Sequence, residues 1–323
     1  MASVNHTAAD RNGTGSHPAI ERPFVDAHHH LWDLGALHYP WLTDRVIPRR
    51  FGDYAAIRRN YLVDDLRRDA VGCGLVKSVH VQANVRGDPV RETAWLQAQS
   101  DAHGLPSAIV ATADLTAPDT ARTLAAHCDY PAMRGIRVLL HWLDDPRYDG
   151  PLRPHLMADP AFRRGYALLG EYGLSFDLPL HHPQADEAVD LLTAFPDIPV
   201  ALNHCGFPVH LERRGSDREQ AWLGWKNAIA RLGRLENLHC KISGLWMAGM
   251  ALDTGDVRPI VEHCLESFGV ERCMLGSNFP LDGLWVPYTE MHSTYLRCLG
   301  GLSTSEIAAV AHDNAAVFYR IRD

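Results

Sequence analysis

Eight short apolar runs alternate with helical segments along nearly the whole chain, and this alternation restricts the fold more than any other feature. The runs cover residues 24–30, 76–84, 107–115, 133–140, 173–180, 199–206, 238–245 and 273–280. Eight strands separated by helices are typical of a (β/α)8 barrel, which needs about 250 residues. We therefore predict a single α/β barrel of the TIM type. A doubly wound sheet is the competing architecture, and the count of eight favours the barrel.

The ends of several helices can be read from the sequence. Asp159 and Pro160 predict an N-cap and a first helical residue, and Gly173 predicts the end of that helix. Further helices are predicted at about 54–70, 89–104, 185–195, 218–235, 256–268 and 303–318. The long first connection, residues 31–75, is of the kind that builds active sites at the carboxyl ends of barrel strands.

Composition restricts the location and the partners of the protein. Residues 1–22 are small and polar, which rules out an ordinary secretory signal and predicts a disordered tail before a barrel at 23–323. Seven cysteines without a CxxC motif predict reduced, packed thiols in a cytoplasmic protein. No apolar run reaches the ~18 residues that span a bilayer. The net charge of −8 argues against nucleic acid or anionic membrane and for a small-molecule partner, with self-association left open.

Polar residues gather where the predicted strands end, which is where barrel enzymes carry their chemistry. Seven of the eight ends carry groups suited to ligation, proton transfer or anion binding. They are His28–His30, His80 with Gln82, Arg134 with Arg137, His181 with His182, Asn203 with His204, Lys241 with Ser243, and Ser277 with Asn278. This distribution predicts a site at the mouth of the barrel.

The first of these groups predicts a pair of metal ligands. Strand alternation points His28 and His30 the same way and His29 the other way. Two imidazoles at this separation suit one metal ion. An isolated His-Xaa-His is also a chance pair in a chain with 19 histidines. His204 at a later strand end favours the site, and Asp26 is expected deeper, in a hydrogen-bonding role.

Other residues leave alternatives open. His80 and Gln82 share one face and are read as pocket lining, and His181 either points inward or serves its loop. Arg137 lies on a buried strand and needs an anionic partner, either a substrate carboxylate or an internal Asp. Lys241 is expected in a pocket or in an ion pair. Trp32 is an aromatic candidate for the substrate pocket.

Several motifs occur in an order that resembles a known family. They are VDAHHHLWD, YPWL, GIRVLL, VALNHCG, CKISGL and CMLGSNFP. Together they resemble the amidohydrolase superfamily, in the branch that contains L-fuconolactonase, sulfomuconolactonase and 2-pyrone-4,6-dicarboxylate lactonase. The resemblance implies a (β/α)8 barrel and mostly lactone hydrolysis. It also implies one divalent metal ion in some relatives, often zinc, and a metal-free site in at least one lactonase type. A nearby branch contains decarboxylases.

Carried over to this chain, the resemblance assigns metal ligands to His28, His30 and His204 and an anion-binding role to Arg137. The strand 8 motif of the family has an aspartate that ligates metal or moves the proton of the attacking water. Asn278 occupies that position here. A neutral amide cannot accept this proton and adds no charge for a cation, so metal affinity is expected to fall.

The missing carboxylate leaves three functions open. The first is hydrolysis of a small, anionic lactone, judged from Arg137 and Lys241, with His204, His80 or His181 as the base. The second is a lyase, such as a decarboxylase, in which Asn278 orients the substrate. The third is a binding protein on an inactive scaffold, which the many ionisable strand ends argue against. We predict the first. Asp282 is the nearest carboxylate in sequence and is expected out on its loop.

Overall fold

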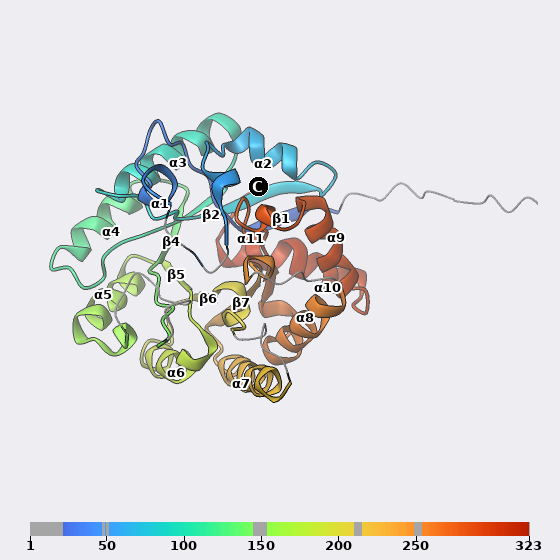
Figure 1. Ribbon diagram of the computed structural model, residues 1–323. Helices are drawn as coiled ribbons and strands as arrows, with labels where there is room; N and C mark the ends of the chain where they lie inside the picture. The colour runs from blue at the N-terminus through green and yellow to red at the C-terminus, as the bar shows by residue number, and fades with distance from the viewer. Residues whose placement is uncertain are drawn as a thin grey trace, which may run out of the picture.

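The computed structural model describes residues 22–46, 49, 52–144, 154–209, 215–248 and 254–322. Eight parallel strands form one sheet in chain order, with the helices in a ring around them (Figure 1). The strands are β1 Phe24–His29, β2 Leu75–Val81, β3 Ala108–Ala111, β4 Met133–Arg137, β5 Ser175–Leu178, β6 Val200–Leu202, β7 Leu238–Ile242 and β8 Cys273–Leu275. The predicted (β/α)8 barrel is confirmed. The predicted tail at 1–22 lies, up to residue 21, outside the described residues.

The first and last strands meet through the segments that follow them. The backbone N–H of Asn278 donates to the carbonyl of His28 at 2.6 Å, and that of His30 donates to Phe279 at 2.8 Å. These two bonds join residues that are about 250 positions apart in the sequence. The loop after β8 therefore lies directly beside the histidines of β1.

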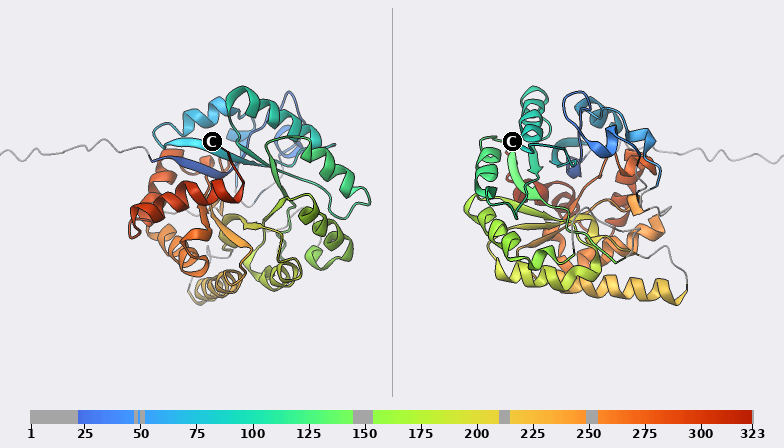
Figure 2. Two further views of the ribbon diagram at one scale, coloured as in Figure 1. Left: turned by 180° about the vertical axis from the view of Figure 1, so that it is seen from behind. Right: turned by 60° about the vertical axis from the view of Figure 1, so that its left-hand side comes forward.

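Helices also surround the strands when the molecule is seen from behind (Figure 2, left). They are α1 Pro40–Thr43, α2 Val63–Asp69, α3 Val90–His103, α4 Thr120–Cys128, α5 Pro160–Glu171, α6 Ala185–Ala194, α7 Ser216–Leu232, α8 Thr254–Phe268, α9 Tyr288–Cys298, α10 Thr304–Ala308 and α11 Asn314–Phe318. The sequence did not predict α4 or α9. The single helix predicted at 303–318 is interrupted by a π-helical turn, Ala309–Asp313.

The predicted start of α5 is confirmed in atomic detail. The Asp159 carboxylate accepts the backbone N–H groups of Ala161 at 2.7 Å and Phe162 at 3.2 Å. These are two of the donors that the first turn of a helix leaves unpaired. Gly173, in the left-handed region with φ +62°, follows the helix as predicted.

Every strand ends earlier than the apolar runs suggested, and this decides where the site lies. The chain leaves the extended conformation after β6, because His204 and Cys205 have φ of +54° and +52°. Asn278, after β8, has φ +56°. Residues in this region cannot continue a strand. The candidate site residues therefore lie mostly on the loops at the mouth and not within the sheet.

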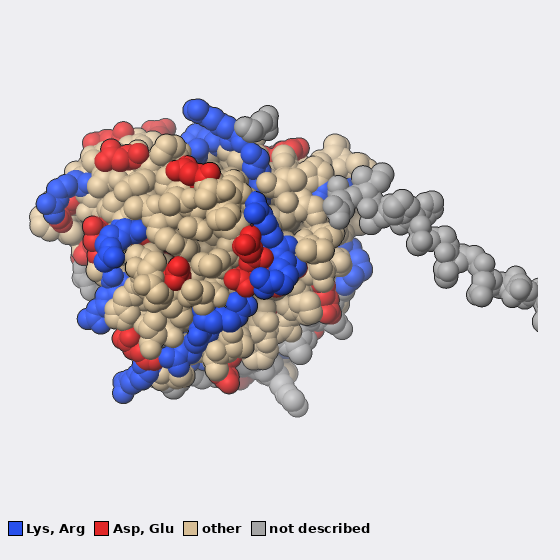
Figure 3. Space-filling view, turned by 90° about the horizontal axis from the view of Figure 1, so that it is seen from above, with Lys and Arg blue, Asp and Glu red and all other residues tan. Residues whose placement is uncertain are grey.

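Apolar side chains fill two layers. One packs between the strands and the helices, and a smaller one fills the barrel, where Val25, Val79, Val110 and Met274 meet Tyr319 from the C-terminal segment. None of the helices in the described ranges is long and apolar enough to cross a bilayer. On the face in Figure 3, positive and negative side chains are interspersed.

Candidate active site

Four polar residues from three distant segments converge at the carboxyl ends of the strands, and we call them the mouth cluster: His28, His30, His204 and Asn278. The ring centroid of His28 lies 5.2 Å from that of His30 and 4.4 Å from that of His204. The Oδ1 of Asn278 lies 3.3 Å from Nε2 of His30. All four are buried. The structure thus brings together the three histidines predicted as metal ligands and Asn278.

The tautomer of His30 follows from its second nitrogen. Nδ1 of His30 lies 2.6 Å from the carbonyl oxygen of Val81. A carbonyl only accepts, so Nδ1 carries the proton and Nε2 of the neutral ring is an acceptor. Burial keeps the pKa of His30 well below its usual value, so the ring is neutral near pH 7. Nε2 therefore offers a lone pair to the mouth.

The amide of Asn278 is fixed by a carboxylate behind it. Oδ1 of Asp282 accepts the backbone N–H of Met247 at 2.9 Å and the Nδ2 of Asn278 at 3.1 Å. Because Asp282 needs a donor, Asn278 turns its Nδ2 toward Asp282 and its Oδ1 toward His30. Two acceptors then face each other, so the 3.3 Å contact is not a hydrogen bond in the neutral state. A cation shared by both atoms would satisfy them.

The other two imidazoles extend this set of acceptors. Both ring nitrogens of His28 are buried and have no hydrogen-bond partner. Its pKa is well below the usual value because of burial and the neighbouring His204. Nδ1 of His204 lies 2.9 Å from Oγ of Ser243, which sets the orientation of its ring. The unpartnered ring nitrogens of His28, together with Nε2 of His30 and the amide oxygen of Asn278, are a donor set that fits a divalent metal ion such as zinc.

Asp26 holds the two sides of the mouth together. Its carboxylate accepts Ser277 Oγ at 2.6 Å, Ser277 N at 2.8 Å, Tyr288 OH at 2.9 Å and the backbone N–H of His28 at 3.1 Å. Burial raises the pKa of Asp26 to about 6. The carboxylate therefore ties β1 to the loop after β8 and to α9. This matches the hydrogen-bonding role predicted for Asp26.

Arg137 is a buried cation at the end of β4. Its guanidinium donates to the carbonyl oxygen of Gln82, and no carboxylate of the described residues forms an ion pair with it. Burial lowers the pKa of Arg137 to about 10, so it stays charged near pH 7. A buried guanidinium whose Nε has no partner is suited to an anionic ligand.

A cavity of about 570 Å³ lies at the same end of the barrel, beyond β2, β3 and β4. Its wall includes Gln82, Asn84, Thr112, Asp114 and Val138. The size is in the range of small-molecule pockets. The mouth cluster does not line it, so it is a neighbouring space and not the reaction centre. Gln82 lines this cavity, and its role in substrate binding stays a prediction.

The sequence predicted that Lys241 binds substrate, but its side chain lies below the mouth of the barrel, in a buried ion pair. Its Nζ contacts Oδ2 of Asp177 at 2.5 Å, with both side chains completely buried. Asp177 also accepts Asn203 Nδ2 at 2.9 Å and Tyr319 OH at 2.7 Å. We call these four residues the inner ion-pair cluster. The ion pair was one of the two alternatives for Lys241, and it holds the ammonium on Asp177 and not in the substrate site.

Trp32 is also engaged elsewhere. Its Nε1 donates to the carbonyl of Arg59 at 2.6 Å, and its ring packs on Trp41 and Tyr61. The side chain is completely buried and its ring lies 6.5 Å from that of His30. Trp32 therefore supports His30 from behind, and the structure does not place it as a substrate contact.

Two histidines considered as bases do not join the mouth cluster directly. Nδ1 of His80 accepts the backbone N–H of Leu31 at 3.0 Å, so Nε2 carries the proton of the neutral ring. His80 is therefore a donor and not a base, which corrects one sequence-based interpretation. His181 packs against Phe207, and Phe207 in turn packs against His204, with ring centroids 5.6 and 4.8 Å apart.

Sequence reasoning missed the role of Asp282. We expected this residue out on its loop, but it is completely buried at the start of a 3-10 turn, Asp282–Leu284. The turn is possible because Asn278, in the left-handed region, reverses the chain after β8. The spacing of four residues between Asn278 and Asp282 was the one available signal.

In a (β/α)8 barrel, neutral histidines and an amide oxygen at the carboxyl ends of the strands lie where barrel enzymes carry their active sites. The chain belongs to the amidohydrolase family, whose model (described as Amidohydrolase) matches residues 25–321. The family expectation drawn from the motifs is confirmed.

Individual relatives span nearly the whole chain. The uncharacterized protein y4mH of Sinorhizobium fredii is 40% identical over 298 residues, which are 92% of this chain and 98% of that protein. The L-fucono-1,5-lactonase of Burkholderia multivorans is 28% identical over 305 residues, with 92% and 96% covered. A zinc-bound amidohydrolase structure from Burkholderia multivorans has 25% identity and a TM-score of 0.77, covering 93% of this chain and 100% of that one.

Proposed function

We propose that the chain is a hydrolase that opens a small lactone carrying an anionic group. The observation that carries the proposal is the convergence of unpartnered acceptors, His28, His30 Nε2 and Asn278 Oδ1, at the barrel mouth. The similarity to L-fucono-1,5-lactonase supports a cyclic ester as the substrate class. The buried Arg137, which lacks a carboxylate partner in the described chain, supports the negative charge on the substrate.

In this proposal Arg137 binds the substrate and His204 transfers the proton. Arg137 binds the anionic group of the substrate and places the lactone carbonyl at the mouth cluster. His204, oriented by Ser243, accepts a proton from water as the water oxygen bonds to the carbonyl carbon. The ring C–O bond then breaks, and His204 returns the proton to the leaving alkoxide. The product is an open-chain hydroxy acid.

A divalent metal ion fits the mouth cluster. His28, His30 and Asn278 would hold it, since each offers an unpaired lone pair there. When bound, such an ion polarises the carbonyl and lowers the pKa of water. Asp282 keeps the oxygen of Asn278 turned toward the site, so the amide serves where relatives of the family have a carboxylate.

Turnover of a panel of lactones, with and without carboxylate groups, tests the proposal. His204→Asn is the main variant, because Asn tolerates a positive φ and its amide retains the contact with Ser243. We expect kcat to fall by about 10²–10⁴, the usual contribution of general-base catalysis. His29→Gln is the matched control, because its amide reaches Ser78 as His29 does, at 2.9 Å, outside the mouth cluster.

Two outcomes would contradict the proposal. Unchanged turnover in His204→Asn would remove the assigned base, and absence of hydrolysis of every lactone by the wild-type protein would remove the activity. Asn278→Asp separates hydrolase from lyase. Faster lactone hydrolysis in this variant would indicate that the native reaction is non-hydrolytic, whereas a clear loss would show that the amide is required.

A further inference from the structure

A second group of potential ligands lies outside the mouth. The Sγ atoms of Cys205, Cys240 and Cys264 all lie within 4.8 Å of one another. All three side chains are completely buried, and Cys273, also completely buried, neighbours Cys240 across the β7–β8 pairing. We call Cys205, Cys240 and Cys264 the thiol cluster. Four of the seven cysteines of the chain thus meet in one place.

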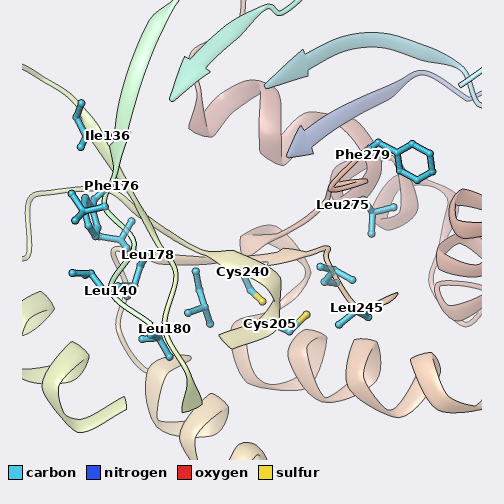
Figure 4. Packing of buried hydrophobic residues seen from close by; sticks show 14 of the residues in the cluster. Ile136, Leu140, Phe176, Leu178, Leu180, Cys205, Cys240, Leu245, Leu275 and Phe279 are labelled. Atoms are coloured by element: carbon cyan, nitrogen blue, oxygen red, sulfur yellow. The ribbon is translucent and has the colours of Figure 1, made fainter. Parts of the chain in front are cut away.

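The fold brings these sulfurs together from separate elements. Along β7, Leu238, Cys240 and Ile242 belong to the layer between sheet and helices, whereas Lys241 points into the barrel. Cys264 reaches the same layer from α8. Cys205 arrives from the loop after β6, in the left-handed region. Figure 4 shows Cys205 and Cys240 side by side, with their sulfur atoms on facing sides.

The surroundings of the thiol cluster select the kind of ligand. Apolar side chains such as Leu245 and Leu275 line it (Figure 4). Sγ of Cys205 donates a weak hydrogen bond to the backbone carbonyl of Lys241, at 3.6 Å. Sulfur is the ligand of soft metal ions, whereas hard ions need oxygen. A dry, apolar site also favours a complex with little net charge.

We propose that the thiol cluster binds one soft, thiophilic divalent metal ion, independently of the mouth cluster. Two thiols each release a proton to solvent as their S–metal bonds form, and these two thiolates balance the charge of the ion. The third sulfur completes the coordination. Because all three sulfurs are already close together, binding requires little rearrangement of the chain.

Cadmium is the probe for this site. The full-length protein is equilibrated with Cd²⁺ until the ultraviolet absorption is constant, and it is also produced in cells grown with Cd²⁺, so that folding occurs around the ion. Thiolate-to-cadmium charge transfer reports sulfur ligation, and imidazole-bound cadmium at the mouth does not produce this band. We expect a band that saturates at one equivalent.

Two variants and one control assign the band. Cys264→Ala and Cys240→Ala each remove one sulfur, and each is expected to weaken Cd²⁺ binding by roughly tenfold or more, since even the loss of a supporting contact has that effect. Cys298→Ala is the matched control, because Cys298 is a buried helical cysteine outside the cluster. No charge-transfer band by either route, or an unchanged band in Cys264→Ala and Cys240→Ala, would overturn the proposal.

Discussion

Two groups of buried polar residues occupy the same barrel, and they differ in how their atoms are paired. In the inner ion-pair cluster, Lys241, Asn203 and Tyr319 all direct donors to the carboxylate of Asp177. In the mouth cluster, His28 has no hydrogen-bond partner for either ring nitrogen, and acceptors of His30 and Asn278 face each other. Burial is nearly complete in both.

This difference distinguishes buried polar groups that stabilise the fold from buried polar groups that bind a ligand. Buried polar groups that satisfy one another hold the strands β5 and β7 and the C-terminal segment in place. Buried polar groups that remain unsatisfied lower stability and persist where a ligand completes them. Substitutions should therefore affect stability in the inner ion-pair cluster and ligand binding in the mouth cluster.

The largest effect is expected from Asp177→Ala. The substitution leaves the ammonium of Lys241 buried without its carboxylate, so the free energy of unfolding should fall by about 3–5 kcal/mol. Denaturant unfolding measures the loss. A similar loss in His28→Ala would erase the distinction between the two clusters, because His28 gives up no side-chain hydrogen bond.

The double variant Lys241→Met with Asp177→Leu sharpens this test. Replacing both charges by apolar side chains removes the unpaired ammonium, so part of the lost stability should return. The recovery should be incomplete, because Asn203 and Tyr319 still lose their acceptor. A double variant as unstable as Asp177→Ala would show that the ion pair itself is not the cause.

Glu92 tests whether burial alone, or the pairing of a buried carboxyl group with a cation, determines its contribution to stability. This carboxyl group is buried like Asp177, but it accepts only neutral donors, Tyr39 OH at 3.0 Å and Ala83 N at 3.2 Å. Burial raises the pKa of Glu92 to about 7, from 4.5. A raised carboxyl pKa means that the folded state holds a proton that the unfolded state has lost.

The contribution of Glu92 to stability is therefore present below about pH 4.5 and is lost as the pH rises through 7. The loss should be about 3 kcal/mol, since each pH unit between the two pKa values contributes about 1.36 kcal/mol. Unfolding free energies of wild type and Glu92→Gln across pH 4.5–8 measure it. A constant difference between the two proteins over this range would refute the prediction.

A smaller effect is expected from Asp282→Ala at the mouth cluster. Without the carboxylate, the amide of Asn278 is no longer held with its oxygen toward His30, so zinc affinity should fall about 10–100-fold. Competition with a chromophoric chelator measures the affinity. Asp282→Asn retains an acceptor oxygen and should stay near wild type. Equal losses in both variants would assign Asp282 a purely structural role.

The fold was largely predictable because apolar runs and helix ends are local signals. Asp159 marked α5, and the eight runs gave the strand order. The helices α4 and α9 were missed although their buried residues recur at helical spacing, as Tyr288, Met291, Tyr295 and Cys298 do in α9. The strand ends were placed too late because left-handed residues such as His204 and Asn278 are not apparent from hydrophobicity.

The candidate site was predictable where residue type alone suffices. Histidines at strand ends drew attention to His28, His30 and His204, and the family motif drew attention to Asn278. The pairing of Lys241 was not predictable, because Asp177 lies on β5 and β6 separates it from β7. The tautomers of the histidines could not be predicted from the sequence either, because they depend on contacts such as that between Nδ1 of His30 and the carbonyl oxygen of Val81.

Zinc binding to the wild-type protein and to His28→Ala tests the central claim most directly. Stoichiometry is measured by equilibrium competition, with His29→Gln as the control in the adjacent position. We predict that His28→Ala binds one equivalent less than wild type and that His29→Gln binds the same as wild type. Equal zinc stoichiometry and affinity in wild type and His28→Ala would show that the unpartnered nitrogens of the mouth cluster do not serve a metal ion.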